Sequence, residues 1–193
     1  AGLMAVDGLA LVHSRTALLD NFLAFFILLA SYLFLTKRYW WTGLVPGLAL
    51  ATKWSALYFI IAFGVIGLYR AFTHHSGRDV IKPTLQRFGQ FGLTPLLIYI
   101  TSWAGWFGSN RGWDRNYSAN IFSSFIYYHQ QMLDFHTGLT EKHTYQANPW
   151  SWLVMGRPTS FFYETPDSCG ASSCSQEILA LGTPFLWWLG TIA

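Results

Sequence analysis

The stretch from Gly43 to Phe72, GLVPGLALATKWSALYFIIAFGVIGLYRAF, decides how this chain is folded. It is apolar throughout, apart from an interruption at Thr52-Lys53-Trp54. One long helix would put its two ends on opposite sides of a membrane, whereas two short helices turning near Lys53 would put both ends on one side. Each short arm has about 15 residues, which is little for a full crossing at 1.5 Å per residue. The second alternative therefore implies thin, protein-buried helices or a broken hairpin.

Basic residues on both flanks of this stretch favour the hairpin. Lys37 and Arg38 precede it, and the polar segment from Arg70 to Arg87 follows it. Lys and Arg collect on the cytoplasmic side of membrane proteins, and only the hairpin puts both clusters on one side. The expected cytoplasmic set is Lys37, Arg38, Arg70, Arg78, Lys82 and Arg87, with the single acid Asp79. Lys53 is then expected at the outer surface, beside His13, Arg15 and Asp20.

Composition indicates a membrane protein before any motif is considered. Of the 193 residues, 52% are apolar and only 11% are charged, against roughly 25% charged residues in soluble domains. Aromatic residues make up 19%, which suits a chain whose Trp and Tyr side chains lie at membrane interfaces. We therefore predict an all-α fold, a polytopic membrane helical bundle. The predicted spans are residues 20–36, 43–72 as the broken hairpin, 88–107 and 178–193, and residues 108–177 form an external loop.

The two ends of the sequence indicate a fragment of a longer chain. The sequence opens on AGLMAVDGLALVHSR, without a starting Met or a signal-peptide pattern, and it closes within the apolar run from Ile178 to Ala193. We expect further spans on both sides, and catalytic groups among them.

The external loop contains a predicted amphipathic helix. Between Ile121 and Leu139 the apolar residues recur every three or four positions, as on one face of a helix. We expect this helix to lie on the membrane or on the protein. His129, His136 and His143 recur every seventh residue, which is wider than the usual spacing of metal ligands, so we expect pocket-forming histidines and no metal.

The same loop holds both cysteines of the chain, Cys169 and Cys174, in a run rich in Gly and Ser. Two Cys five residues apart can close a small ring, and disulfides persist in oxidising compartments. We favour an extracytoplasmic disulfide over two free thiols. A zinc site is the weakest alternative, because two Cys supply too few ligands.

Charged residues beside apolar segments are the candidates for chemistry. Arg15 and Asp20 form either an ion pair at a helix end or a site for substrate. Lys53 either extends to the lipid headgroups or points into a cavity, where it would hold a lipid phosphate. Two classes of protein stay open on these grounds, an enzyme that acts at the outer leaflet and a transporter. The sequence contains no internal repeat, which counts against a transporter.

Three segments resemble one enzyme family, the dolichyl-phosphate-mannose protein mannosyltransferases. The first is DGLALVHSRTALLDNFLAFF (Asp7 to Phe26), where an S-R pair precedes L-L-D and an apolar helix, and the second is GLALATKWSALY (Gly47 to Tyr58). The third is YHQQMLDFHTGLTEKHTYQANPWSWLVMGRP (Tyr128 to Pro158), which is similar to the outer region of the family. Together they cover almost the whole chain, and the actinobacterial members look closest. Ala147 stands where the family often has Ser, which weakens any role for a small polar residue there.

The resemblance implies a GT-C-like fold whose active site opens to the outside. It implies transfer of mannose from a polyprenyl-phosphate carrier to Ser or Thr hydroxyls of secreted proteins, with inversion and without a cofactor. The expected partners are the polyprenyl-phosphate-mannose donor, secreted acceptor proteins, the secretion machinery and membrane lipids, and not nucleic acid. The alternatives are another GT-C glycosyltransferase with a lipid or glycan acceptor, and a transporter.

The resemblance also assigns roles to individual residues. The main catalytic carboxylate of the family lies before this segment, so Asp20 is expected in a supporting role. Arg15 and Lys53 are the expected ligands of the lipid phosphate. The side chains expected to line the acceptor or sugar site are His129, His143, Trp150, Trp152 and Arg157.

Overall fold

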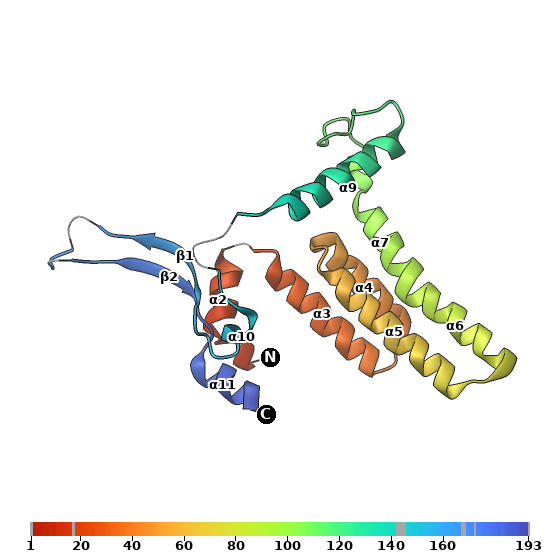
Figure 1. The fold of residues 1–193 in the computed structure, drawn as a ribbon, viewed down its shortest axis with the longest axis horizontal. Coiled ribbons are helices and arrows are strands. Elements are labelled where there is room, and N and C mark those ends of the chain that lie inside the picture. The colour runs from red at the N-terminus through yellow and green to blue at the C-terminus, as the bar shows by residue number, and fades with distance from the viewer. Residues whose placement is uncertain (1, 17, 142–145, 167–168, 172, 193) are drawn as a thin grey trace. The chain divides into compact units, whose positions relative to one another are not determined.

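The structure is a computed structural model that describes residues 2–16, 18–141, 146–166, 169–171 and 173–192. The chain divides into two compact units (Figure 1). The first comprises Ala1–Asn21 and Thr140–Ala193, and the second comprises Phe22–Leu139. Each unit has its own arrangement of elements.

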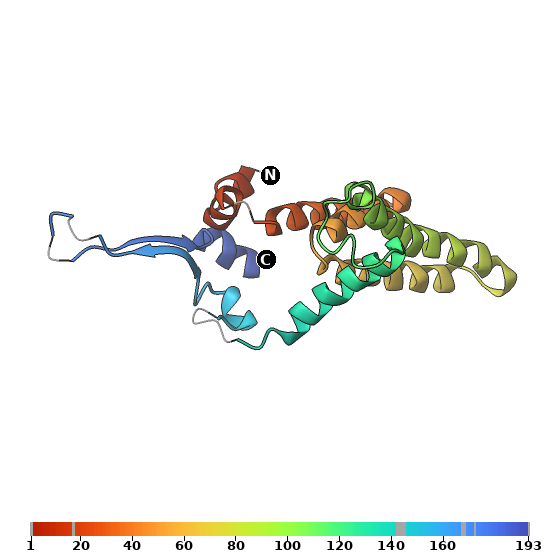
Figure 2. The same cartoon turned by 90° about the horizontal axis from the view of Figure 1, so that it is seen from above.

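The second unit is a bundle of antiparallel helices, and Figures 1 and 2 show successive helices side by side. Its helices are α3 (Asp20–Leu35, of which the first two residues belong to the first unit), α4 (Tyr39–Thr52), α5 (Ala56–His74), η1 (Gly77–Val80), α6 (Ile81–Phe88), η2 (Gly89–Leu93) and α7 (Thr94–Ser102). The elements α6, η2 and α7 follow one another without a gap, and η2 is a π-helical segment between two α-helical ones.

The stretch from Gly43 to Phe72 forms two helices, with the break where the hairpin interpretation expects it. Helix α4 ends at Thr52, and Lys53 has an extended backbone, with φ −155° and ψ 134°. Helix α5 begins at Ala56. Within the described residues, α5 is the one uninterrupted helix that is long and apolar enough to cross a membrane, and α3 is apolar but shorter. The polytopic arrangement of the spans stays a prediction.

Two glycines bring α4 against η2 and α7. A Cβ atom at Gly43 would overlap the backbone carbonyl group of Gln90, and one at Gly47 would lie 2.7 Å from Cβ of Ile98 and 2.9 Å from Cα of Pro95. Gly43 and Gly47 lie four residues apart and so share one face of α4, the small-xxx-small spacing with which helices approach closely in membranes. The missing side chains therefore determine how closely these helices pack.

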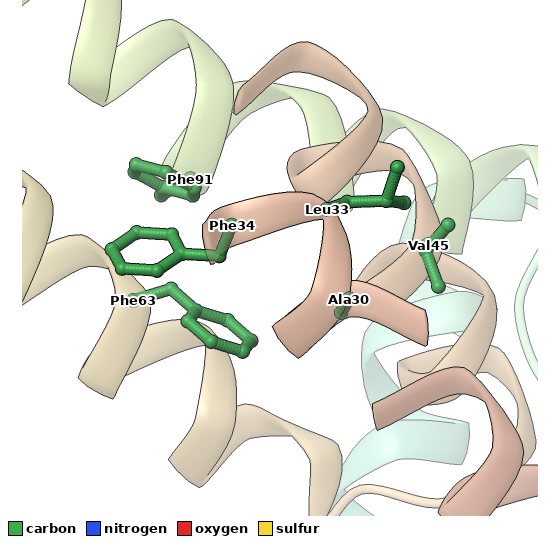
Figure 3. Close-up of a cluster of buried hydrophobic side chains, with 6 residues drawn as sticks. All are labelled: Ala30, Leu33, Phe34, Val45, Phe63 and Phe91. Atoms are coloured by element: carbon green, nitrogen blue, oxygen red, sulfur yellow. The ribbon is translucent and has the colours of Figure 1, made fainter. Parts of the chain in front are cut away.

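Phenylalanine rings from three helices form the core of the bundle (Figure 3). Phe34 of α3 lies 5.1 Å from the ring of Phe63 on α5 and 5.9 Å from the ring of Phe91 in η2. Ala30, Leu33 and Val45 complete this buried cluster. Large apolar side chains elsewhere on the bundle are exposed, for example Phe25, Leu28 and Tyr69. An apolar exterior of this kind is expected of helices that face lipid.

Basic residues gather at one end of the bundle. The guanidinium of Arg87 lies 3.8 Å from the ring centre of Tyr39 and donates to Oε1 of Gln90 at 2.7 Å. Arg70 lies 5.0 Å from the ring centre of Phe34, next to the turn that carries Lys37. These contacts bring both basic clusters to the same end of the second unit, which is the arrangement that the hairpin interpretation requires.

The opposite end of the bundle continues into α8 (Ala104–Phe107) and α9 (Ile121–Gly138). Asn120 caps α9, because its side-chain oxygen accepts a hydrogen bond from the N–H of Phe122 at 2.9 Å. Helix α9 confirms the amphipathic helix predicted from Ile121 to Leu139. One face of α9, with Phe125 and Tyr128, packs on the aromatic end of α7 and α8.

The first unit is a mixed arrangement and corrects the all-α prediction. Its elements are α1 (Gly2–Ala5), α2 (Gly8–Arg15), α10 (Pro149–Trp152), β1 (Thr159–Glu164), β2 (Gln176–Ala180) and α11 (Pro184–Ile192). Strands β1 and β2 form an antiparallel hairpin. Thr and aromatic residues in TSFFYE have high strand propensity, and this local preference explains a strand within the predicted external loop. The segment between the strands contains the Cys169–Cys174 disulfide, with the Cα atoms 6.3 Å apart.

The predicted span at 178–193 starts too early, while its crossing of a membrane stays a prediction. Ile178 to Ala180 belong to β2, and Gly182-Thr183 separates this strand from the helix that begins at Pro184. Proline is favoured at the first position of a helix, because the N–H of that position has no acceptor within the helix. The absence of an N–H in proline therefore costs no hydrogen bond there. The helix in this region therefore begins at Pro184 and continues to Ile192, the last described residue.

Candidate functional site

Three side chains from separate segments form a hydrogen-bond chain at the aromatic end of the second unit. The indole N–H of Trp54 donates to Oη of Tyr99 at 3.1 Å. Oη of Tyr99 lies 2.7 Å from Nε2 of His129, whose Nδ1 lies 2.8 Å from the carbonyl oxygen of Phe125. These hydrogen bonds thus connect the break between α4 and α5 to α7 and α9.

The chemistry of these groups determines the direction of the chain. A carbonyl oxygen can only accept, so we assign the proton of His129 to Nδ1, and Nε2 of the neutral ring is then an acceptor. The Tyr99 hydroxyl donates to Nε2 and accepts from Trp54. When His129 is neutral, each donor among Trp54, Tyr99 and His129 has an acceptor, so all three hydrogen bonds can form together.

Aromatic rings enclose this chain. The ring of Trp54 stacks on His129 at 5.8 Å with an interplanar angle of 21°, and Phe125 and Trp103 lie 4.2 Å and 4.9 Å from His129. Tyr99 is only 9% exposed. His129, predicted to line the acceptor or sugar site, therefore has both ring nitrogens bonded to protein atoms.

Lys53 precedes Trp54 in the break between α4 and α5, and Lys53 is exposed. Its position follows from that of Trp54, which is held on two sides by Tyr99 and His129. Arg15 is the last residue of α2 in the first unit, and it is also exposed. Arg15 and Lys53 belong to different units, so their joint action on one phosphate stays a prediction.

The other predicted site residues are distributed over both units. Asp20 starts α3 and is half-buried, while Trp150, Trp152 and Arg157 are exposed in and after α10. His143 lies outside the described residues. His136 lines a hollow of about 220 Å³ on α9 together with Trp113, Tyr128, Gln131, Met132 and Phe135.

Asp7 organises the first unit, although the sequence analysis assigned it no role. One of its oxygens, Oδ2, accepts from the N–H of Ala10, and the other, Oδ1, accepts from the N–H of Thr183 at 2.8 Å and from the indole N–H of Trp187 at 3.1 Å. Asp7 is therefore both the N-cap of α2 and the link to the start of α11. An Asp directly before an apolar helical segment was the sequence signal for the cap.

The environment of Asp7 lowers the pKa of its carboxyl group. Burial alone would raise the pKa, but the hydrogen bonds from Thr183, Ala10 and Trp187 outweigh burial and bring it below the usual 3.8. The carboxylate therefore stabilises the fold fully above pH 3.8, and this contribution is lost as the pH falls through the lowered pKa.

Replacing Asp7 with Ala is expected to destabilise the full-length protein by about 2–3 kcal/mol, because it removes a helix cap and leaves three half-buried donors without their acceptor. Asp7→Asn retains one acceptor oxygen and should lose less, and its stability should fall less steeply in acid. Thermal unfolding measured from pH 7 to pH 3 tests both expectations. The exposed Asp134→Asn is the matched control, and equal unfolding midpoints for Asp7→Ala and Asp134→Asn would contradict the role of Asp7.

The second unit, with its apolar exterior, its span-length helix α5 and the cluster of basic residues at one end, is a helical unit of membrane type. The family model described as dolichyl-phosphate-mannose-protein mannosyltransferase matches residues 1–103, and the model described as the C-terminal four TMM region of protein-O-mannosyltransferase matches residues 121–193. The chain therefore belongs to the dolichyl-phosphate-mannose-protein mannosyltransferase family, as the resemblance of its three segments implied.

Curated relatives come from actinobacteria, and each is named polyprenol-phosphate-mannose–protein mannosyltransferase. The one from Corynebacterium glutamicum is 33% identical over 98% of this chain and 48% of its own length. Those from Mycolicibacterium smegmatis and Mycobacterium tuberculosis are 31% and 29% identical, over 98% and 97% of this chain and 48% and 47% of their own lengths. The chain thus spans about half the length of these relatives. No solved structure matches it significantly.

Proposed function

We propose that this chain is part of a multi-pass membrane enzyme that transfers mannose from polyprenyl-phosphate-mannose to Ser or Thr hydroxyls of secreted proteins at the outer face of the membrane. The observation that carries the proposal is the match of both family models, in order, along nearly the whole chain. The names of the relatives support the same donor and a protein acceptor.

The chemistry is a displacement at the anomeric carbon with inversion. The acceptor oxygen forms a bond to C1 of mannose, the bond from C1 to the phosphate oxygen breaks, and a carboxylate takes the hydroxyl proton. The polyprenyl phosphate leaves as a dianion, which cationic groups stabilise in a dry site. Arg15 and Lys53 serve this purpose in the proposal, and Asp20 supports the site beside them. The general base lies in another part of the protein.

The outward orientation rests on two features of the second unit and one of the first. Arg70 and Arg87 lie at one end of the bundle with the other residues of the expected cytoplasmic set, and Lys53 and the Trp54–Tyr99–His129 hydrogen bonds lie at the opposite end. Trp and Tyr side chains gather where a bundle meets the headgroups. The Cys169–Cys174 disulfide suits an oxidising compartment.

Transfer itself is tested with membranes that contain the full-length protein, polyprenyl-phosphate-mannose labelled in the sugar, and a Ser/Thr-rich peptide. We expect label on the peptide, releasable by alkaline β-elimination, and none on a matched peptide in which Ala replaces Ser and Thr. Label in lipid or glycan alone would favour another glycosyltransferase, and movement of donor across the membrane without transfer would favour a transporter.

Impermeant thiol labelling tests the topology. In intact cells, Ser123→Cys on α9 is expected to react, and Ser76→Cys, before η1, is expected to react only after the membrane is permeabilised, because residues 73–87 face the cytoplasm. Both positions are exposed in the structure, so access to the side chain is matched. Labelling of Ser76→Cys from outside would overturn the hairpin topology.

A further inference from the structure

We infer that Tyr99 is a positioning residue for Lys53 and acts through its hydrogen bonds to Trp54 and His129. The inference rests on the proposed function, in which Lys53 binds the donor phosphate, and it adds how the protein holds that lysine in place. It also gives His129 a role that differs from lining the sugar site.

The backbone around Lys53 forms the break between α4 and α5. Lys53 N–H closes the last turn of α4 by donating to the carbonyl of Ala49 at 2.8 Å, and its carbonyl accepts from the N–H of Ala56 at 3.1 Å. Between these two bonds the chain is extended, outside both helices. A lysine side chain is a flexible four-carbon stem, so the position of its ammonium depends on the position of the segment that carries it.

Trp54 is the side chain that attaches this segment to the rest of the unit. Its indole N–H reaches Tyr99 and its ring stacks on His129. Tyr99 comes from α7 and His129 from α9, so the break is attached to two helices that are distant in sequence. The half-buried and buried rings around the contact exclude water, which strengthens both hydrogen bonds.

Tyr99 is central to this arrangement, because its single hydroxyl forms the hydrogen bonds to both Trp54 and His129. Tyr99→Phe keeps the ring but removes both hydrogen bonds, and it leaves the indole N–H of Trp54 and Nε2 of His129 without their partner. The ring contacts of Trp54 persist, so the segment shifts rather than unfolds. We expect kcat/KM for the donor to fall about tenfold, equivalent to about 1.4 kcal/mol.

A double-mutant cycle in the full-length protein separates positioning from a general structural effect. The four proteins are wild type, Tyr99→Phe, Lys53→Met and the double variant, assayed with polyprenyl-phosphate-mannose and a Ser/Thr-rich peptide. If Tyr99 acts through Lys53, Tyr99→Phe lowers kcat/KM for the donor about tenfold in wild type and less than twofold in the Lys53→Met background. The KM for the acceptor peptide stays unchanged in Tyr99→Phe.

Four further variants sharpen the test. Tyr127→Phe removes a hydroxyl from α9, where the ring of Tyr127 stacks on Tyr117 at 3.6 Å, and it should behave as wild type. His129→Gln offers an oxygen to the Tyr99 hydroxyl and should retain more activity than His129→Phe. If Tyr99→Phe does not accumulate as folded protein, Trp54→Phe replaces it in the cycle, since it removes the N–H donor together with the five-membered ring and keeps a six-membered aromatic ring.

The outcomes distinguish the inference from the proposed function beneath it. A wild-type protein that transfers no mannose, or a Lys53→Met variant with nearly wild-type transfer, removes the proposed role of Lys53 and the inference with it. If Lys53→Met is impaired but Tyr99→Phe is normal, or the two losses multiply, the role of Lys53 stands and positioning by Tyr99 is overturned.

Discussion

Replacing Lys53 or Arg15 with Met is expected to lower the rate of mannose transfer by about 10²- to 10³-fold, the loss seen when a group that stabilises transition-state charge is removed. Methionine keeps an apolar side chain of similar length and removes the charge. The reason for so large an effect is that the leaving phosphate is dianionic, so that removing a cation beside it leaves the developing negative charge without compensation.

The measurement is transfer of labelled mannose by folded protein, quantified for each variant in membranes of the same composition. Lys82→Met is the matched control, because Lys82 is an exposed base on α6, at the basic end of the second unit. It should transfer mannose at the wild-type rate. Nearly wild-type rates for both Lys53→Met and Arg15→Met would leave Lys53 as a lysine that only extends to the headgroups.

The second large effect is expected at Gly43, where even a methyl group has no room. In Gly43→Ala the new Cβ overlaps the backbone carbonyl of Gln90, which no side-chain rotation relieves, so α4 must move away from η2 and α7. Overpacking of this kind costs about 1–3 kcal/mol and occasionally more, and we expect the upper end because backbone opposes backbone.

Thermal unfolding of the purified full-length protein measures this loss. Gly64→Ala, within α5, is the matched control, since its Cβ would lie 3.7 Å from Cβ of Phe91, an ordinary contact. We expect Gly64→Ala to unfold at or above the wild-type midpoint, because Ala favours a helix over Gly. A Gly43→Ala protein as stable as Gly64→Ala would show that α4 and η2 pack less closely than the structure has them.

Membership of the family and the local helical pattern were both accessible from the sequence. The polar interruption at Lys53 marks the break between α4 and α5, and the period of apolar residues after Ile121 marks α9. These features are local, because a helix repeats every 3.6 residues and a charged residue interrupts an apolar run wherever it stands. The same local pattern misplaced the start of the last helix, because the end of β2 and the helix that begins at Pro184 together form one apolar run.

The links between distant segments were decided only by the tertiary structure. Asp7 meets Thr183 and Trp187 across more than 170 residues of sequence, and Trp54 and Tyr99, which meet at His129, are 45 residues apart. Apolar period and charge distribution determine which segments become helices, but they do not state which donor finds which acceptor. Pairing of buried polar groups depends on the packed positions of helices, which glycines such as Gly43 set by allowing close approach.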